Sequence, residues 1–184
     1  RRNTGYAVDE LIKMQPFKSE GMPLNLSKLL AGSEGTLAFT TAITLELDPL
    51  PPKNTVMLVL HFKSISEAMK AVAPVMQNHL YTCELIDKTI LDCTKDHPGY
   101  QKNRFFLQDD PKAILLLELR HEDKEELKAQ LARLEDQVNK QQLAYAAVPL
   151  WGDEIDLANE LRHAGLGLLG NMVGDDKAVA CIED

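Results

Sequence analysis

One short segment combines residue types that suit the binding of an anion. Gly32-Ser33-Glu34-Gly35-Thr36-Leu37 has two glycines three positions apart and two hydroxyl side chains. Glycine leaves the backbone bare and free to take a positive φ. Successive N–H groups, with the Ser33 and Thr36 hydroxyls, can then face a phosphate or pyrophosphate. A plain turn before a strand explains the same residues, and the segment alone does not decide between the two.

A second glycine-rich segment matches a known motif by its letters only. Residues 165–170 spell G-x-G-x-x-G. The dinucleotide-binding motif needs a strand before the glycines and a helix after them, because the pyrophosphate binds at the helix N-terminus. Here a predicted helix precedes the glycines. We therefore expect a flexible glycine-rich connection and no nucleotide site.

Other residue types that could do chemistry are scattered along the chain. The five histidines show no H-x-H or H-E-x-x-H spacing, and the three cysteines include no C-x-x-C pair. We therefore expect no metal site and assign no catalytic residue. Widely spaced cysteines of this kind are typical of reduced, partly buried thiols, which favours a cytoplasmic protein.

Composition and charge exclude several classes of protein. The chain has 184 residues, of which 45% are hydrophobic and 26% charged, and this balance suits a packed core. Lys and Arg number 20 against 28 Asp and Glu, a net charge of −8 without a basic run. We expect no nucleic-acid partner, because phosphate contacts need clustered cations. No apolar run approaches the roughly 18–20 residues of a transmembrane segment.

The elements that position these residues fall into two parts. Strict alternation of apolar and polar residues over 37–47 predicts a strand with one apolar face. A proline-rich segment at 48–52 ends this strand, because proline cannot donate to a ladder. We take it as the boundary between a first part, residues 1–52, and a second part, residues 53–184.

The second part shows a regular series of strands and helices. Ser64 and Asp123 each stand three residues before a glutamate, the spacing of a capping box, and Pro74 should kink or shorten the first helix. We expect strands at 55–62, 83–86, 113–120, 143–148 and 178–182, and helices after Ser64, at 88–94, after Asp123 and at 153–164, the last closed by Gly165. This order predicts an α+β fold, a ferredoxin-like split βαβ antiparallel sheet with helices on one face.

The order of the N-terminal motifs resembles that of a known family. Asn3-Thr4-Gly5-Tyr6 precedes the Gly-Ser-Glu-Gly-Thr-Leu turn, and a long strand and Asp48-Pro49-Leu50-Pro51 follow it. This order is similar to the end of the flavin domain in FAD-linked oxidases of the vanillyl-alcohol oxidase / p-cresol methylhydroxylase type. The branch it resembles contains D-lactate dehydrogenase, the glycolate oxidase flavin subunit and D-2-hydroxyglutarate dehydrogenase. The resemblance implies that residues 1–52 end an FAD-binding domain and residues 53–184 begin a substrate, or cap, domain.

The same resemblance implies roles for individual residues. Arg162, in Leu161-Arg162, matches a family arginine that binds the substrate carboxylate; a surface arginine near a helix C-terminus is the other explanation. The implied reaction is the oxidation of a D-2-hydroxy acid to the 2-oxo acid, with hydride transfer to flavin and an unknown electron acceptor. The residues implied to bind FAD are Gly32, Ser33, Glu34, Gly35 and Thr36, with Thr4 and Gly5 nearby.

The ends of the chain lead to further expectations. It opens on Arg1-Arg2-Asn3 without Met and stops at Asp184. The resemblance implies that the pyrophosphate loop lies before this start and the metal and base residues lie after this end, so we expect an internal fragment that alone neither holds FAD tightly nor turns over. The strand at 37–47 should pair with another copy of the chain and give a homo-oligomer. The alternative is a free-standing ferredoxin-like module that binds a small molecule or a partner without catalysis.

Overall fold

The computed structural model describes residues 5–95 and 97–170. Contacts divide the described chain into two units, one that ends at Pro49 and one that begins at Leu50. The first unit holds two one-turn helices, α1 (Val8–Leu11) and α2 (Ser27–Leu30). Met14 and Ser33 are its buried side chains.

The strand expected at 37–47 is not formed, which corrects the sequence interpretation. None of the described ladders includes this segment. The apolar side chains of its alternating pattern are exposed, Phe39 at 92% and Leu47 at 84%. A strand exists only through hydrogen bonds to a neighbour, so alternation alone cannot form one. A homo-oligomer through this segment stays a prediction.

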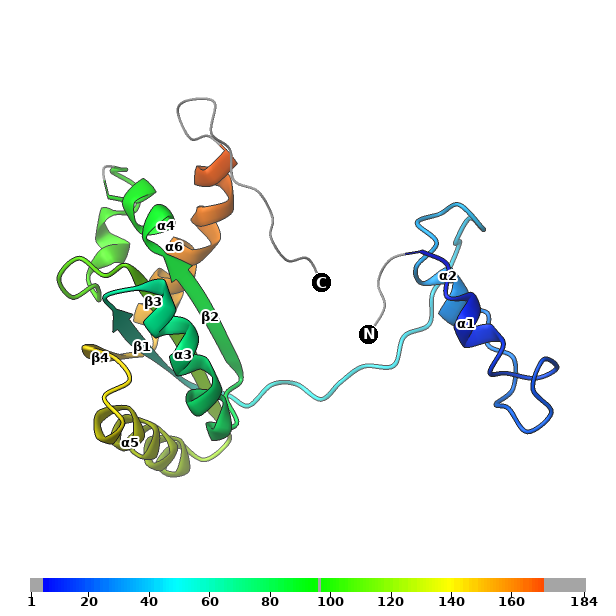
Figure 1. Ribbon diagram of the computed structural model, residues 1–184, viewed down its shortest axis with the longest axis horizontal. Coiled ribbons are helices and arrows are strands. Elements are labelled where there is room, and N and C mark those ends of the chain that lie inside the picture. The colour runs from blue at the N-terminus through cyan, green and yellow to red at the C-terminus, as the bar shows by residue number, and fades with distance from the viewer. Residues whose placement is uncertain (1–4, 96, 171–184) are drawn as a thin grey trace. The chain divides into compact units, whose positions relative to one another are not determined.

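The second unit is built on a four-stranded antiparallel sheet in the order β2-β3-β1-β4 (Figure 1). The strands are β1 (Asn54–Phe62), β2 (Thr82–Asp87), β3 (Ala113–His121) and β4 (Ala146–Trp151). Helix α3 (Ile65–Val75) connects β1 to β2, and α5 (Lys124–Lys140) connects β3 to β4. This is the ferredoxin-like split βαβ arrangement, and it confirms the predicted α+β class.

Local sequence signals set the ends of these helices, as predicted. The Ser64 hydroxyl accepts a hydrogen bond from the backbone of Glu67 at 3.2 Å. The Asp123 carboxylate accepts from the backbone of Glu126 at 3.1 Å. Helix α3 ends one residue after Pro74, and the short 3-10 helix η1 (Met76–Asn78) follows. Each cap satisfies an N–H group that has no partner within its own helix.

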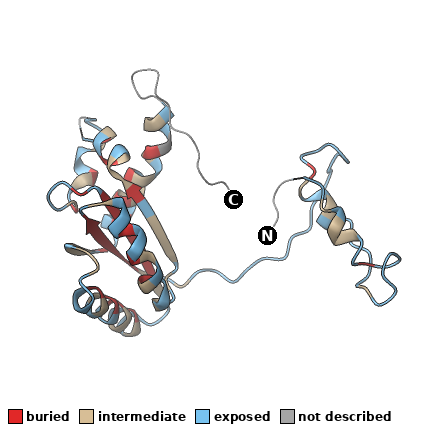
Figure 2. Cartoon of the chain, in the orientation of Figure 1, coloured by how far each residue is buried: buried red, intermediate tan, exposed pale blue. Residues whose placement is uncertain are grey.

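Helices cover both faces of the sheet (Figure 2), where the sequence predicted one. Helices α3 and α5 cover the predicted face. The second face is covered by α4 (Lys88–Cys93), the 3-10 helix η2 (Gln101–Arg104) and α6 (Asp153–Gly170). Both faces of β1 are therefore buried, and its side chains from 56 to 62 are all inaccessible to solvent.

Two predicted boundaries are wrong. Strand β4 begins and ends three residues later than expected, because it includes Pro149. This is an edge strand that pairs with β1 alone, where a missing N–H is tolerated. Helix α6 continues through Gly165 to Gly170, so the G-x-G-x-x-G letters lie within a helix and form no flexible connection. The strand expected at 178–182 lies outside the described residues.

None of the described helices combines the length and the apolar character that crossing a membrane requires.

A buried histidine on the second face of β1 has no hydrogen-bond partner. His61 is 0% exposed, and neither of its ring nitrogens makes a hydrogen bond of normal geometry to the described residues. Its ring lies 6.0 Å from that of Tyr145, centroid to centroid. Burial disfavours the charged imidazolium and lowers the pKa of His61 below 6.5.

This burial predicts a pH-dependent stability. Below the unfolded pKa of 6.5 the unfolded chain binds a proton that folded His61 does not bind. As the pH is lowered below 6.5, the free energy of unfolding should therefore decrease by about 1.4 kcal/mol per pH unit, until the folded pKa is reached. The substitution His61→Phe keeps an aromatic ring and should abolish this contribution. Urea unfolding across the pH range measures both slopes.

A matched control is His163→Gln, because the His163 side chain is exposed. This variant should keep the slope of the unsubstituted chain. A His61→Phe variant with an unchanged slope would show that another group causes the acid destabilisation.

Candidate functional site

The turn predicted to bind an anion is formed, and its two hydroxyl groups stabilise the turn itself. The Ser33 hydroxyl donates to the carbonyl of Leu30 at 2.9 Å, and the Thr36 hydroxyl donates to the carbonyl of Ser33 at 2.6 Å. Glu34 and Gly35 have positive φ angles of 50° and 77°. Their backbone N–H groups meet no acceptor among the described residues. These two donors can therefore face an external anion.

Residues near the N-terminus meet this turn. The Tyr6 hydroxyl lies 2.6 Å from Oγ1 of Thr36. The carbonyl oxygen of Gly5 lies 3.1 Å from the point where a Cβ on Gly32 would stand, so a larger residue at position 32 would press on it. The residues that the structure brings together are thus Gly5, Tyr6, Gly32, Ser33, Glu34, Gly35 and Thr36. Thr4 lies outside the described residues, and contact of this group with FAD stays a prediction.

Helix α6 carries Arg162 across the second face of the sheet. Ile155, Ala158 and Leu161 are buried against that face at helical spacing. Three residues beyond Arg162, Gly165 packs on α4, where a Cβ would lie 3.0 Å from Cγ2 of Ile90. The missing side chain allows the two helices to approach closely, which explains a glycine inside a helix despite its low propensity.

A buried asparagine fixes the middle of α6. Asn103 of η2 is 0% exposed, and its amide donates to the carbonyl of Leu157 at 2.8 Å and to the carboxylate of Glu160 at 2.9 Å. A buried polar group that lost such bonds would be costly. Asn103 therefore holds α6 against the segment that precedes β3.

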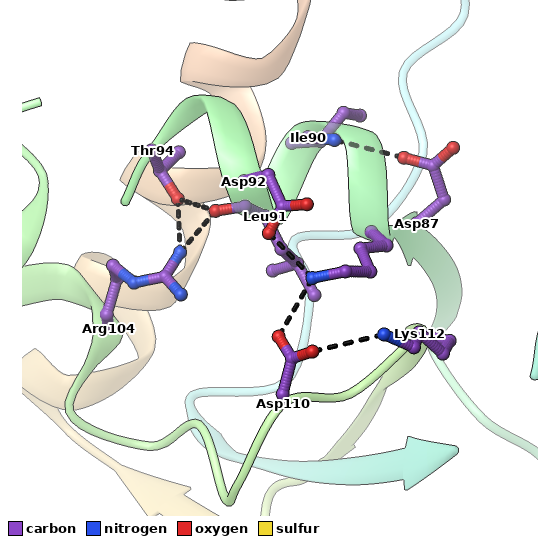
Figure 3. A network of polar contacts seen from close by, with 9 residues as sticks. Asp87, Ile90, Leu91, Asp92, Thr94, Arg104, Asp110 and Lys112 are labelled. Carbon is purple, nitrogen blue, oxygen red and sulfur yellow. Dashed lines mark hydrogen bonds and ion pairs between the residues drawn. The ribbon is translucent and has the colours of Figure 1, made fainter. Parts of the chain in front are cut away.

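An ion network holds α4, the neighbour of α6, in place (Figure 3). Lys88 lies 2.8 Å from carboxylate oxygens of both Asp92 and Asp110, and Lys112 lies 3.1 Å from the second oxygen of Asp110. The Lys88 and Lys112 ammonium groups lower the pKa of Asp110 to about 2. Asp110 therefore stays ionised and joins the start of α4 to the turn before β3.

The two ends of α4 have further hydrogen bonds (Figure 3). At its start, the Asp87 carboxylate accepts from the backbone N–H of Ile90 at 3.1 Å. At its end, the Arg104 side chain donates to the carbonyl of Leu91 and to the hydroxyl of Thr94, the C-cap residue. Helix α4 is thus a fixed support for α6.

Arg162, the predicted substrate-binding residue, holds a carboxylate of the chain itself. Its Nη2 lies 2.8 Å from Oε1 of Glu84 on β2, and both side chains are 38% exposed. Strand β2 is at the edge of the sheet. The guanidinium is thus carried by a packed helix, partly open to solvent, and placed where it binds a carboxylate.

A second ion pair occupies the same face of the sheet and is more buried. Glu118 of β3 accepts from Nε of Arg120 at 2.6 Å and from the Thr82 hydroxyl at 3.2 Å. The guanidinium carbon of Arg120 also lies 4.1 Å from the ring centroid of Tyr81. Thr82 and Glu84 share one side of β2, since alternate residues of a strand face the same way.

Sequence reasoning missed several of these residues. Glu84 could have been found from the strand pattern, because it shares the side of β2 on which Ile86 is buried. A carboxylate on such a side is stable only with a cation or a hydrogen-bond donor beside it. No periodic signal marks Asn103. Within residues 5–95 and 97–170, no group of three or more His, Cys, Asp or Glu side chains could hold a metal ion.

Comparison with known proteins decides the family. The family described as FAD linked oxidases, C-terminal domain, matches residues 51–184. The chain belongs to this family. The boundary of the match lies close to the start of the second structural unit at Leu50.

Several curated proteins are similar to this member of the FAD-linked oxidase family. D-2-hydroxyglutarate dehydrogenase of Pantoea ananatis is 25% identical over 191 aligned positions, which cover 98% of this chain and 18% of that protein. The Escherichia coli enzyme of the same name is 26% identical, with the same shares covered. The glycolate oxidase subunit GlcD of Escherichia coli is 31% identical over 62% of this chain and 25% of that protein. The chain thus spans less than a fifth of the length of the dehydrogenases it matches.

The close contact of Gly165 gives a test of how α6 is positioned. Gly165→Val should lower the free energy of unfolding by about 1–3 kcal/mol, because the new side chain must displace Ile90 or shift the helix. Urea unfolding followed by circular dichroism measures this loss.

The matched control is Gly167→Val in the same helix, since a Cβ at position 167 meets nothing within 4 Å. This variant should keep or slightly raise stability, because valine is a better helix former than glycine. Equal losses in the two variants would contradict the assigned packing of α6 on α4.

Proposed function

We propose that the chain is part of an FAD-dependent oxidoreductase that oxidises a D-2-hydroxy acid to the corresponding 2-oxo acid. Its membership of the FAD-linked oxidase family supports the flavin. The names of its relatives support the substrate class, because hydroxyglutarate and glycolate are both 2-hydroxy acids. In this proposal residues 1–52 end the FAD-binding domain, and residues 53–184 belong to the substrate domain.

The ion pair of Arg162 is the observation that carries the proposal. The Glu84 carboxylate lies 2.8 Å from the guanidinium. The carboxylate of a 2-hydroxy acid can form the same charged hydrogen bond with Arg162. The planar donors of a guanidinium match the two oxygens of a carboxylate. We assign to Arg162 the binding of the substrate carboxylate.

The turn at residues 32–36 is proposed to contact the FAD. The N–H groups of Glu34 and Gly35 are donors of the kind that a phosphate or a flavin oxygen accepts. The bare backbone of Gly35 adds no steric barrier, since a Cβ there would meet nothing within 4 Å. When bound, the flavin supplies the redox chemistry by accepting a hydride.

The proposal extends to the compartment. Cys83 and Cys93 are free thiols, as is usual for proteins of a reducing compartment, and we place the protein in the cytoplasm.

Anaerobic flavin reduction tests this function in the FAD-loaded holoenzyme that contains the chain. D-2-hydroxyglutarate, D-lactate and glycolate are each mixed with the oxidised holoenzyme, and loss of the flavin absorbance is followed. At least one should bleach the flavin, with the D-enantiomer of a chiral acid preferred. Arg162→Gln should lower kcat/KM by roughly 10- to 100-fold, because a charged hydrogen bond to the substrate is lost.

Arg133→Gln is the matched control, because Arg133 of α5 forms a similar exposed pair with Glu126 at 2.7 Å. It should leave kcat/KM unchanged. A flavin that no 2-hydroxy acid reduces would contradict the proposed reaction. A normal rate for Arg162→Gln would contradict the role of Arg162 alone.

A further inference from the structure

The Arg162–Glu84 pair differs from the other cation contacts on the same side of the sheet. It consists of a single contact from Nη2 to Oε1, and 38% of each side chain is exposed. The Glu118 side chain that pairs with Arg120 is only 9% exposed, and its carboxylate has the Thr82 hydroxyl as a second donor. Of the two pairs, the one at Arg162 is the more readily opened, because both of its members can be hydrated when they separate.

Three other cations near α4 and β3 are less available to bind an incoming carboxylate. Lys88 contacts two carboxylates at 2.8 Å, and Arg104 donates to a carbonyl and a hydroxyl that belong to the end of α4. Arg120 has both a carboxylate and an aromatic ring as partners. Of Lys88, Arg104, Arg120 and Arg162, an incoming carboxylate would therefore exchange the partner of Arg162 most easily.

We propose that Glu84 is a specificity-determining residue, an internal anion that competes with the ligand carboxylate for Arg162. This inference rests on the proposed function, in which Arg162 binds the substrate carboxylate. The Glu84 side chain comes from the edge strand β2 and Arg162 from α6, so the contact can open by side-chain rotation without a change in either element. Glu84 then keeps the guanidinium paired until a ligand replaces it.

The competition follows from the charges. Two carboxylates at one guanidinium repel each other, and this repulsion weakens the binding of an anionic ligand. A neutral ligand of the same shape feels no such repulsion. The substitution Glu84→Gln removes the charge and keeps the length of the side chain. It should strengthen the binding of a carboxylate more than that of a carboxamide, which also displaces Glu84 but is not repelled by it.

Binding of D-lactate and of its neutral analogue D-lactamide to the full 184-residue chain tests this inference. The Nε–H resonance of Arg162 is followed by NMR during each titration. Glu84→Gln should bind D-lactate about two- to fivefold more tightly, the range of an exposed ion pair, and should gain less for D-lactamide. In an Arg162→Gln background, followed through backbone resonances of α6, Glu84→Gln should have no effect.

The control is Glu126→Gln, which removes a carboxylate from the exposed pair with Arg133 on α5 and should leave D-lactate affinity unchanged. Unchanged or weaker D-lactate binding by Glu84→Gln overturns the competition, while the proposed function stands if Arg162→Gln still weakens binding. If Arg162→Gln binds D-lactate normally, or if no variant shows a ligand-induced shift, the role of Arg162 fails and the competition fails with it.

Discussion

Burial of both faces of β1 is the constraint on which the second unit depends. The seven residues from Val56 to Phe62 are buried without a break, so apolar side chains leave both sides of the central sheet. Helices α3 and α5 cover one side, and α6 with α4 and η2 must cover the other. Because α6 follows β4 and ends against α4, it crosses the sheet toward β2 and brings Arg162 to Glu84. The candidate binding residue is thus placed by the packing of the core.

Much of this unit could be predicted from the sequence, because its signals are local. The hydroxyl of Ser64 and the carboxylate of Asp123 cap their helices at the expected spacing. What failed depends on contacts between distant residues. A glycine such as Gly165 usually signals a helix end, yet α6 continues through it. The glycine is needed there because Ile90 of α4 leaves no room for a side chain. The alternating segment 37–47 forms no strand because alternation does not supply a partner.

The candidate site shows the same division. Gly32 to Thr36 were recognised by composition and order, and the structure forms the turn and brings Gly5 and Tyr6 to it. Arg162 was identified by resemblance alone, since an arginine near a helix end carries little information by itself. Glu84 emerged from the structure, because only folding brings β2 and α6 together.

The most direct measurement of the central claim is a structure of the FAD-loaded holoenzyme with a bound D-2-hydroxy acid. The ligand carboxylate should lie at hydrogen-bond distance from the Arg162 guanidinium, about 2.7–3.1 Å, and Glu84 should be turned away from it. An Arg162 that remains paired with Glu84, with the ligand carboxylate held by other residues, would contradict the account.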